Sequence, residues 1–182
     1  SDSLTSRSYI YAENQKVLMA DGSMITFESC SADDQVKALD LPGLDLEEHS
    51  YDVTDWTGSY SETVVSSSLV DTTVVSKKTS GAVNEYFSRI TLDDSNTFED
   101  VASTMLLVKS GSLVKFKSIA QSEVGDEIVM YNVSSSAVAV KTVTGIDTVW
   151  RENTILGSMD VEPYDLFLPF VHNDYTLIQH NP

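Results

Sequence analysis

The sequence is poor in basic residues, in cysteine and in long apolar runs. Only 11 of its 182 residues are Lys or Arg, against 28 Asp or Glu, so the formal net charge is −17. Nucleic-acid backbones are bound by clustered basic side chains, so this balance disfavours a nucleic-acid partner and a DNA-cutting activity. The single cysteine, Cys30, excludes an internal disulfide and a zinc site built from thiolates. We expect it to be a small buried apolar residue.

No apolar run approaches the length of a membrane span, and no segment has the pattern of a signal peptide. We therefore expect a cytoplasmic monomer that binds no membrane, metal or cofactor. Hydrophobic residues make up 41% of the chain, which is a globular composition. The length is sufficient for one domain with a sizeable core.

The residue pattern predicts β structure nearly throughout. Two hairpins are expected, one over residues 16–27 with Asp21-Gly22 in its turn, and one over residues 105–116 with Gly111 at its tip. Further β-branched runs, expected to be strands, cover residues 68–75, 86–92, 127–131 and 137–143. Strands this short and frequent indicate an all-β, closed or strongly curved single domain, which can bring both termini to one place.

Two segments depart from this β pattern. Residues 32–39 predict a short helix capped by Ser31, with acidic residues in its first turn. The stretch from Asp45 to Ser61 is rich in Asp, Glu, Ser and Tyr and has no clear period. It predicts a solvated acidic loop or insertion.

The two ends of the chain carry groups that can cut peptide bonds. The chain ends in His180-Asn181-Pro182. An Asn side-chain amide can attack its own backbone carbonyl and cleave the bond that follows, and a preceding His is placed to hydrogen-bond that carbonyl. Near the other end, Ser3 offers a hydroxyl nucleophile. Each feature alone is typical of polar termini, but with Asp165 and His172 they indicate a protein that cuts at its own ends.

The chain resembles an intein, a protein-splicing element with the Hint (hedgehog/intein) fold. Inteins excise themselves from the flanking host segments, the exteins, and join them. The resemblance covers residues 3–181 and rests on four motifs in order, which are Ser3-Leu4-Thr5-Ser6-Arg7-Ser8-Tyr9-Ile10, Gly125-Asp126-Glu127-Ile128-Val129, Tyr164-Asp165-Leu166 followed by His172, and Ile178-Gln179-His180-Asn181. It implies a horseshoe-like all-β domain with adjacent termini. It also implies single-turnover, autocatalytic cleavage and ligation of peptide bonds.

The resemblance also implies a role for each site residue. Ser3 would attack the carbonyl of Asp2 and turn the Asp2–Ser3 amide into an ester. After transfer of the N-terminal segment to a residue beyond Asn181, cyclisation of Asn181 would cut the bond to Pro182. Asp165 would handle protons between the two ends. His172 would assist the asparagine step, and His180 would stabilise charge at the Asn181 carbonyl.

Three departures from the family pattern affect this reading. The second motif normally holds a Thr and, three residues later, a His that protonates the scissile amide, but Val101 and Thr104 occupy those positions. Pro182 offers no nucleophile, so the chain is expected to cleave without ligating, as an engineered block would cause. The nucleophile is a Ser instead of the commoner Cys, so the chemistry should be insensitive to thiol oxidation.

The expected organisation follows from these motifs. Residues 1–2 are interpreted as an N-extein remnant, residues 3–181 as the intein domain, and residue 182 as the C-extein position. The interval from Met130 to Tyr164 is too short for a homing endonuclease. The Asp2-Ser3 junction resembles a stretch of family-B DNA polymerases where inteins insert, which predicts a host polymerase of phage type.

Two other readings stay open at this point. A degenerate Hint-like domain would keep the fold and only bind or space other modules, and the missing His and Pro182 favour it. An unrelated acidic β-rich interaction module is supported only by the acidic, Ser/Thr-rich composition, and it predicts distant termini.

Overall fold

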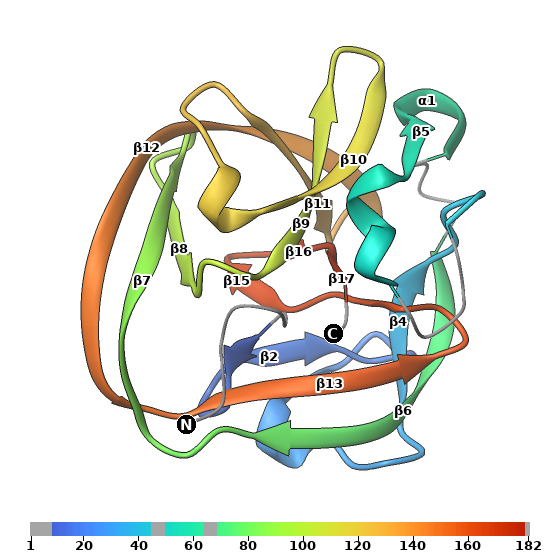
Figure 1. The fold of residues 1–182 in the computed structure, drawn as a ribbon. Coiled ribbons are helices and arrows are strands. Elements are labelled where there is room, and N and C mark those ends of the chain that lie inside the picture. Colours follow the sequence, from blue (N-terminus) through green and yellow to red (C-terminus); the bar gives the residue numbers. More distant parts are fainter. Residues whose placement is uncertain (1–8, 45–49, 64–68, 181–182) are drawn as a thin grey trace.

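The computed structural model describes residues 9–44, 50–63 and 69–180, and it is built almost entirely of β-strands (Figure 1). The strands are β1 (Ile10–Tyr11), β2 (Lys16–Leu18), β3 (Met24–Thr26), β4 (Gln35–Leu39), β5 (Thr57–Ser59), β6 (Leu69–Thr79), β7 (Val83–Leu92), β8 (Thr97–Asp100), β9 (Met105–Ser110), β10 (Leu113–Ser118), β11 (Glu127–Asn132), β12 (Ala137–Thr154), β13 (Leu156–Glu162), β14 (Leu166–Phe167), β15 (Phe170–His172), β16 (Tyr175–Leu177) and β17 (Gln179–His180). The helical elements are the 3-10 turns η1 (Phe27–Ser29), η2 (Ser50–Asp55) and η4 (Ile119–Gln121) and the single turn α1 (Tyr60–Thr63). None of these described helices is long and apolar enough to cross a membrane.

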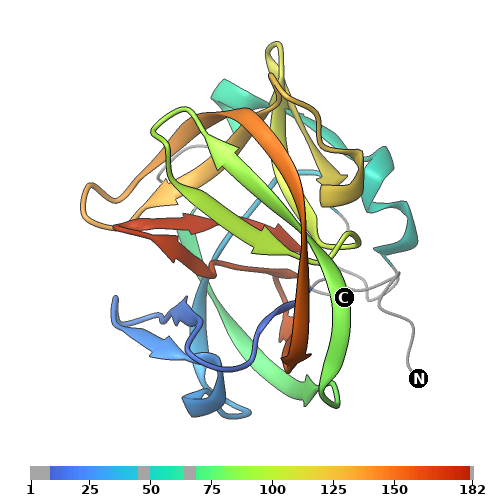
Figure 2. The same cartoon turned by 90° about the vertical axis from the view of Figure 1, so that its left-hand side faces the viewer.

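Two sheets are joined by one long, curved ribbon. The first sheet has the order β1-β13-β6-β4, and the larger one contains the run β14-β17-β9-β11-β12-β7-β8. Strand β12 pairs with β7 in the larger sheet, and the strand after it, β13, pairs with β6 in the smaller one. The paired strands therefore pass from one sheet to the other, as Figures 1 and 2 show from two sides. The result is the curved, all-β single domain that the sequence predicts.

Both predicted hairpins are confirmed. In the first, Val17 pairs with Ile25 and Gly22 takes a positive φ of 87° in the turn. In the second, Ser110 pairs with Leu113 around a two-residue loop that begins with Gly111. Positive φ is the conformation that glycine adopts at no steric cost, so these glycines set the registers of the hairpins. Strands also occur at the four other predicted β-branched runs.

The buried side chains form several apolar clusters. One lies between the hairpin β9–β10 and the C-terminal strands, and it includes Leu107, Phe116, Val129, Leu166 and Ile178. A second lies under the smaller sheet and includes Ile10, Val17, Phe27, Val74 and Phe167. A third lies against the β7–β12 ribbon and includes Ile90, Leu106, Ile128, Met130 and Leu177. Strands β9 and β14 each contribute to two clusters because alternate residues of a strand face opposite sides of the sheet.

The predicted helix over residues 32–39 is wrong. Asp33 has a φ of +76°, which an α-helix does not allow, and residues 35–39 form strand β4 against β6. The acidic residues close a turn instead, in which the Ser31 amide donates to the Asp34 carboxylate at 2.8 Å. From Gln35 onward the inward residues alternate, with Val36 and Ala38 buried, so the strand period of two decides the structure.

The predicted acidic loop is corrected for residues 50–61, whereas residues 45–49 lie outside the described residues. The segment forms η2, β5 and the start of α1, and β5 pairs with β10. Val53 is buried, and the Trp56 ring packs on Phe116 at 5.8 Å between centroids. These two apolar side chains attach an otherwise acidic segment to the core.

Candidate functional site

The described N-terminal end is held in the interior by two side chains from distant parts of the chain. The backbone N–H of Tyr9 donates to the hydroxyl Oγ1 of Thr104 at 3.3 Å. The side-chain Nε2 of Gln179 donates to the Tyr9 carbonyl oxygen at 3.1 Å. Thr104 and Gln179 are both fully buried. Side chains thus bind the backbone N–H and C=O of Tyr9, the residue directly before β1. Strand β1 itself pairs with β13.

Thr104 is positioned by the turn that connects β8 to β9. Its N–H donates to the Val101 carbonyl at 3.2 Å, and its own carbonyl accepts from the Ile119 N–H at 2.9 Å. Thr104 therefore has both backbone groups paired, and its hydroxyl is fixed toward Tyr9. From the sequence, this position is matched to the histidine of the intein motif.

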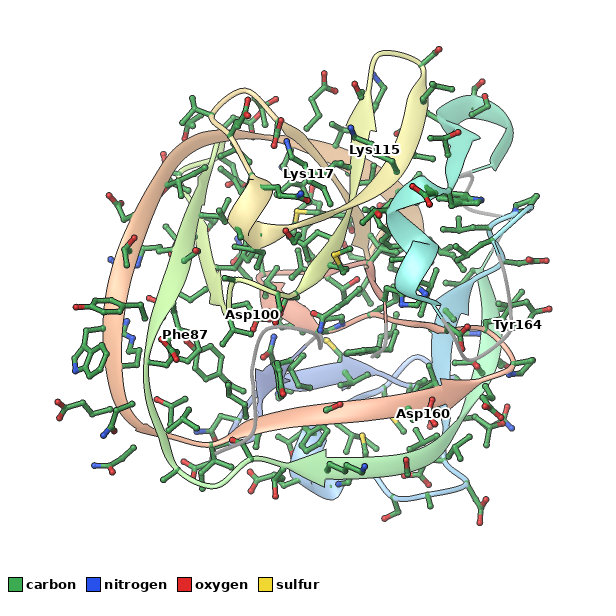
Figure 3. All side chains as sticks on the ribbon, viewed as in Figure 1. Phe87, Asp100, Lys115, Lys117, Asp160 and Tyr164 are labelled. Carbon is green, nitrogen blue, oxygen red and sulfur yellow. The ribbon has the colours of Figure 1, made fainter. Side chains whose placement is uncertain are left out.

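Asp100, the last residue of β8, completes this group. Its Oδ1 accepts from the Val101 N–H at 2.7 Å, and its carboxyl also hydrogen-bonds the Thr104 hydroxyl. Figure 3 shows the side chain inside the molecule, whereas the labelled lysines Lys115 and Lys117 lie toward the end that carries β10. Burial raises the pKa of the Asp100 carboxyl well above its ordinary value, and the two hydrogen bonds offset this only in part. Tyr9, Asp100, Thr104 and Gln179 are called the Tyr9 cluster below.

The described C-terminal end lies beside the Tyr9 cluster. In strand β17, Gln179 pairs with Leu106 of β9 and with Phe167 of β14, and His180 pairs with Leu166. The His180 ring is buried and packs edge-on against Phe116, with 5.4 Å between centroids. The structure therefore brings the penultimate His of the C-terminal motif within one residue of a side chain that holds Tyr9.

Asp165 is also buried, directly before the residue that pairs with His180. The segment is fixed by Thr72, whose hydroxyl donates to the Tyr164 carbonyl at 2.9 Å and accepts from the Tyr164 N–H at 3.1 Å. Asp165 thus directly precedes β14, the strand that pairs with the strand of His180.

His172 lies elsewhere. It pairs with Tyr175 at the tip of the β15–β16 hairpin, and its ring packs on Tyr175 at 5.5 Å between centroids. Five residues of nearly extended chain, about 16 Å, separate Tyr175 from His180. Among the described residues, neither imidazole nitrogen has a hydrogen-bond partner. The assignment of His172 to the asparagine step stays a prediction, since its ring packs on Tyr175 and not, within the described residues, on the Tyr9 cluster.

The electrostatic surroundings of His172 are fixed by one ion pair. Lys141 lies 3.3 Å from Asp94 and its ammonium stacks over the Tyr175 ring at 4.5 Å. Burial is the main cause that lowers the pKa of His172, Lys141 lowers it further, and Asp94 acts in the opposite direction. The imidazole is therefore neutral at neutral pH.

The Gly125-Asp126 motif has a structural explanation. Gly125 takes a φ of +97°, and the Asp126 carboxylate accepts from the Glu123 N–H at 2.9 Å and from the Lys117 ammonium at 2.7 Å. These contacts close the turn before β11. They place no group at the Tyr9 cluster.

The two residues expected to react lie outside the described part of the chain. Ser3 and Asn181, with the junction residues Asp2 and Pro182, are not among the described residues. Within the described ranges, no group of three or more His, Cys, Asp or Glu side chains could hold a metal ion.

Sequence reasoning missed two members of the Tyr9 cluster. Gln179 stood inside a quoted motif without a role, and Asp100 stood outside every motif. Asp100 carried one usable signal, because it follows Phe98 by two residues on the inward face of a strand. A carboxyl at an apolar position of this pattern is unusual enough to suggest a function.

The comparisons with known proteins agree on the fold. The chain is similar in structure to the DnaB intein from Synechocystis sp. PCC 6803, with a TM-score of 0.63 and 12% identity over 96% of this chain and 98% of that one. It is similar to the transcription factor IIB Mvu mini-intein, with a TM-score of 0.64 and 12% identity over 96% of this chain and 100% of that one.

A bacterial intein-like domain from Clostridium thermocellum gives a TM-score of 0.62 and 13% identity over 98% of this chain and 100% of that one. No family model and no curated protein sequence matches. The expected all-β Hint fold is therefore confirmed over nearly the whole chain. The evidence is structural similarity, since the sequence identities are only 12–13%.

Proposed function

We propose that this chain is an intein that splices itself out of a host protein, and that each molecule acts once. The Ser3 hydroxyl attacks the Asp2 carbonyl carbon, the Asp2–Ser3 C–N bond breaks, and the Ser3 nitrogen takes up the proton that the hydroxyl releases. The resulting ester passes the N-terminal segment to a hydroxyl or thiol residue placed after Asn181. Asn181 then cyclises, and the two flanking segments are joined.

The observation that carries this proposal is the contact between the two described ends. Gln179 lies two residues before Asn181 and binds the carbonyl of Tyr9, which lies six residues after Ser3. An acyl transfer between the two junctions requires the ends to be close, because reacting groups must approach to about 3–3.5 Å. An interaction module has no such requirement.

The remaining residues take roles that fit their surroundings. His180 is buried and directly precedes Asn181 in the sequence, and it would stabilise charge at the Asn181 carbonyl. Asp165 lies one residue from the strand partner of His180 and would move protons between the two junctions. Thr104 would act at the N-terminal junction, and a neutral His172 would assist the asparagine step.

Intact-mass spectrometry of a precursor tests the proposal. The precursor carries a small folded partner before Ser1 and another after residue 182, with Pro182 replaced by Ser so that an acceptor hydroxyl is present. We expect a species equal to the two joined partners and a free core of about 20 kDa. The Asn181→Ala precursor should give no ligated product, and the Ser3→Ala precursor should release only the C-terminal partner. An uncut precursor after several days would refute the proposal.

One observation favours a second function, that of a Hint-like domain that only spaces or binds other modules. Thr104 stands where the family motif has its imidazole, and a hydroxyl does not titrate near neutral pH. In that case the Ser3→Ala and Asn181→Ala precursors would behave as the parent does. The same mass spectra therefore decide between the two functions.

The host would be a family-B DNA polymerase of phage type. The support is the Asp2-Ser3 dipeptide at the N-terminal junction. Inserting the chain with a Ser in place of Pro182 at the corresponding junction of such a polymerase should yield a full-length, active polymerase by splicing. Insertion at an unrelated loop serves as the comparison.

A further inference from the structure

The ribbon formed by β7 and β12 carries exposed aromatic side chains. Trp150 of β12 pairs with Tyr86 of β7, and the two rings meet edge to face with 4.8 Å between their centroids. Tyr86 is 59% exposed and Trp150 is 47% exposed, and Ile146, four residues before Trp150 on the same face, is 36% exposed. Large apolar side chains grouped at the surface mark a site of interaction. The splicing steps proposed above give this group no role.

Strand β12 leaves one of its edges open beside these rings. It pairs with β11 only over residues 137–142, and over residues 145–154 its only strand partner among the described residues is β7. Figure 1 shows β12 on the outside of the molecule, beyond β7. Natural edge strands are often blunted by lysine or proline, and residues 145–154 contain neither. The pairing with β7 is regular over residues 145–151, so the open edge can accept a further strand.

The aromatic face of the ribbon carries a carboxylate. The Trp150 indole N–H donates to the Glu152 carboxylate at 3.0 Å, which holds this negative charge beside the two rings. Over residues 145–152 and their partners on β7, Glu152 is the only charged side chain on this face. Residues alternate between the two sides of a strand, so Arg151 points to the opposite face, where it binds Glu99 at 2.7 Å. Tyr86, Trp150 and Glu152 are called the ribbon site below.

Two aromatic rings beside a carboxylate suit an arginine side chain. The planar guanidinium stacks on an aromatic ring and forms an ion pair with a carboxylate at the same time. The net charge of −17 favours a basic partner and opposes pairing of the edge with a second copy of this chain. A strand added to β12 presents every second side chain to the aromatic face. An extended segment with arginine at alternate positions therefore matches the ribbon site.

We propose that the ribbon site docks an extended, arginine-bearing segment of another protein, which adds as a strand to the open edge of β12. Main-chain hydrogen bonds to β12 supply affinity, and the contact of arginine with Trp150, Tyr86 and Glu152 supplies selectivity. This inference goes beyond the proposed splicing function and does not rest on it. Its test involves no cleavage, so the two proposals succeed or fail separately.

An NMR titration of the full chain with a synthetic peptide tests the site. The probe has blocked ends, alternates arginine with valine, and is about eight residues long, a usual strand length. The Trp150 indole N–H signal, assigned with Trp150→Phe, should shift and saturate at peptide concentrations up to about 1 mM. Trp56 is an internal control, because its indole donates to the Pro42 carbonyl at 3.3 Å and its ring packs on Phe116. No shift of the Trp150 signal, or equal shifts of both indoles, would overturn the proposal.

Variants of the ribbon site test the selectivity for arginine, with affinities read from the backbone amide signals of β12. Glu152→Gln keeps an acceptor for the indole but removes the charge, and it should weaken binding of the arginine peptide by about 2- to 5-fold. Trp150→Ala should weaken binding by about 3-fold or more. Leu113→Ala is the matched control, because Leu113 is 49% exposed on β10, where it pairs with both β5 and β9. Equal affinity of all three variants and the parent would overturn the proposal, as would equal binding of a peptide with glutamate in place of arginine.

Hydrogen exchange of the backbone amides tests the added strand. The peptide should slow exchange in residues 145–154, where amides that face the open edge gain acceptors, and should leave the rates in β6 unchanged. A shifted Trp150 signal without slower exchange at this edge would overturn strand addition. Signals of β12 that move with the concentration of the chain alone would show that a second copy occupies the edge, which also overturns the proposal. A Trp150→Ala variant that lowers Tm, with no binding of the peptide to the parent, would show that the ring pair only stabilises the ribbon.

Discussion

Gly157 lies in β13 where the edge of the Phe27 ring packs against the strand. An added Cβ would stand 2.5 Å from Cε1 and 2.6 Å from Cζ of Phe27. Ordinary carbon contacts lie at about 3.5–4.0 Å, so a Gly157→Ala change forces a displacement of roughly 1 Å. The residue also pairs with Ile10 of β1 and with Thr79 of β6, so the strand is held from both sides.

The Phe27 ring has little room to give way. It is fully buried among residues of the smaller sheet, and the Lys77 ammonium lies over its face at 4.7 Å while donating to the Phe27 carbonyl at 2.7 Å. Overpacking of a filled core costs about 1–3 kcal/mol of unfolding free energy. In a domain of this size each kcal/mol lowers Tm by about 2–4 °C. We therefore expect Gly157→Ala to lower Tm by about 2–12 °C.

Thermal unfolding followed by fluorescence measures this change, and Gly81→Ala is its control. Gly81 has no heavy atom within 4 Å of an added Cβ and does not have a positive φ. At such a site Gly→Ala lowers only the conformational entropy of the unfolded chain, so it raises the free energy of unfolding by about 0.4–1 kcal/mol. The two alanine variants should therefore move the unfolding midpoint in opposite directions.

A double-mutant cycle identifies the cause. Phe27→Leu removes the ring atoms that the new Cβ would meet, at the ordinary cost of a smaller core side chain. If steric overlap is the cause, Gly157→Ala should cost less in the Phe27→Leu background than in the parent, with a coupling of about 0.5–3 kcal/mol. A neutral Gly157→Ala variant, or strictly additive effects, would refute this packing argument.

Three further predictions concern titratable groups. Asp100→Asn should stabilise the protein at neutral pH. The pKa of Asp100 is raised in the folded state, so the stability that its protonated carboxyl contributes is lost as the pH rises through that folded-state pKa. Equal unfolding free energies of parent and variant from about pH 4 to pH 8 in urea titrations would contradict this prediction. Glu99→Gln should destabilise by about 1–2 kcal/mol at neutral pH, since two arginines lose their carboxylate. Burial alone raises the pKa of Glu99, but the hydrogen bonds from Arg151, Arg89 and Tyr11 outweigh it, so the difference from the parent should vanish as the pH falls through the lowered pKa. His172 should titrate below its ordinary pKa of about 6.5 in a proton NMR titration, and a midpoint above that value would show that Asp94, not burial, controls it.

The fold was predictable where local chemistry and strand period agree. The Asp21-Gly22 turn and the Gly111 tip fix their hairpins through backbone conformations that glycine adopts freely. The same agreement failed at residues 32–39, where Asp residues typical of a helix start instead close a turn. There the alternating burial of Val36 and Ala38 outweighs the local signal, since packing against β6 contributes more than a cap.

The roles of the predicted site residues stay predictions, but the structure shows where three of them lie. Thr104 binds the Tyr9 N–H, and His180 pairs with Leu166, the residue after Asp165. Gln179 could not be assigned, because its partner Tyr9 lies 170 residues away in the chain. Asp100 could not be assigned, because its place at the site comes through Thr104, whose hydroxyl binds the Tyr9 N–H 95 residues away. Such pairings are set by topology, which no local pattern encodes.

One strand holds both described ends of the chain. Thr104 directly precedes β9 and binds the Tyr9 N–H, and Leu106, two residues later, pairs with Gln179. Leu107 N–H also donates to the Ile178 carbonyl at 3.3 Å. Because β9 sits between β17 and β11 in the larger sheet, a shift of β9 would move the Tyr9 cluster and the C-terminal strand together. Hydrogen bonding to a common strand thus keeps the distance between the two ends constant, which a transfer from one junction to the other demands. The spacing of the junctions should therefore tolerate changes in the β7–β12 ribbon, which pairs with neither β17 nor β1, better than changes in β9.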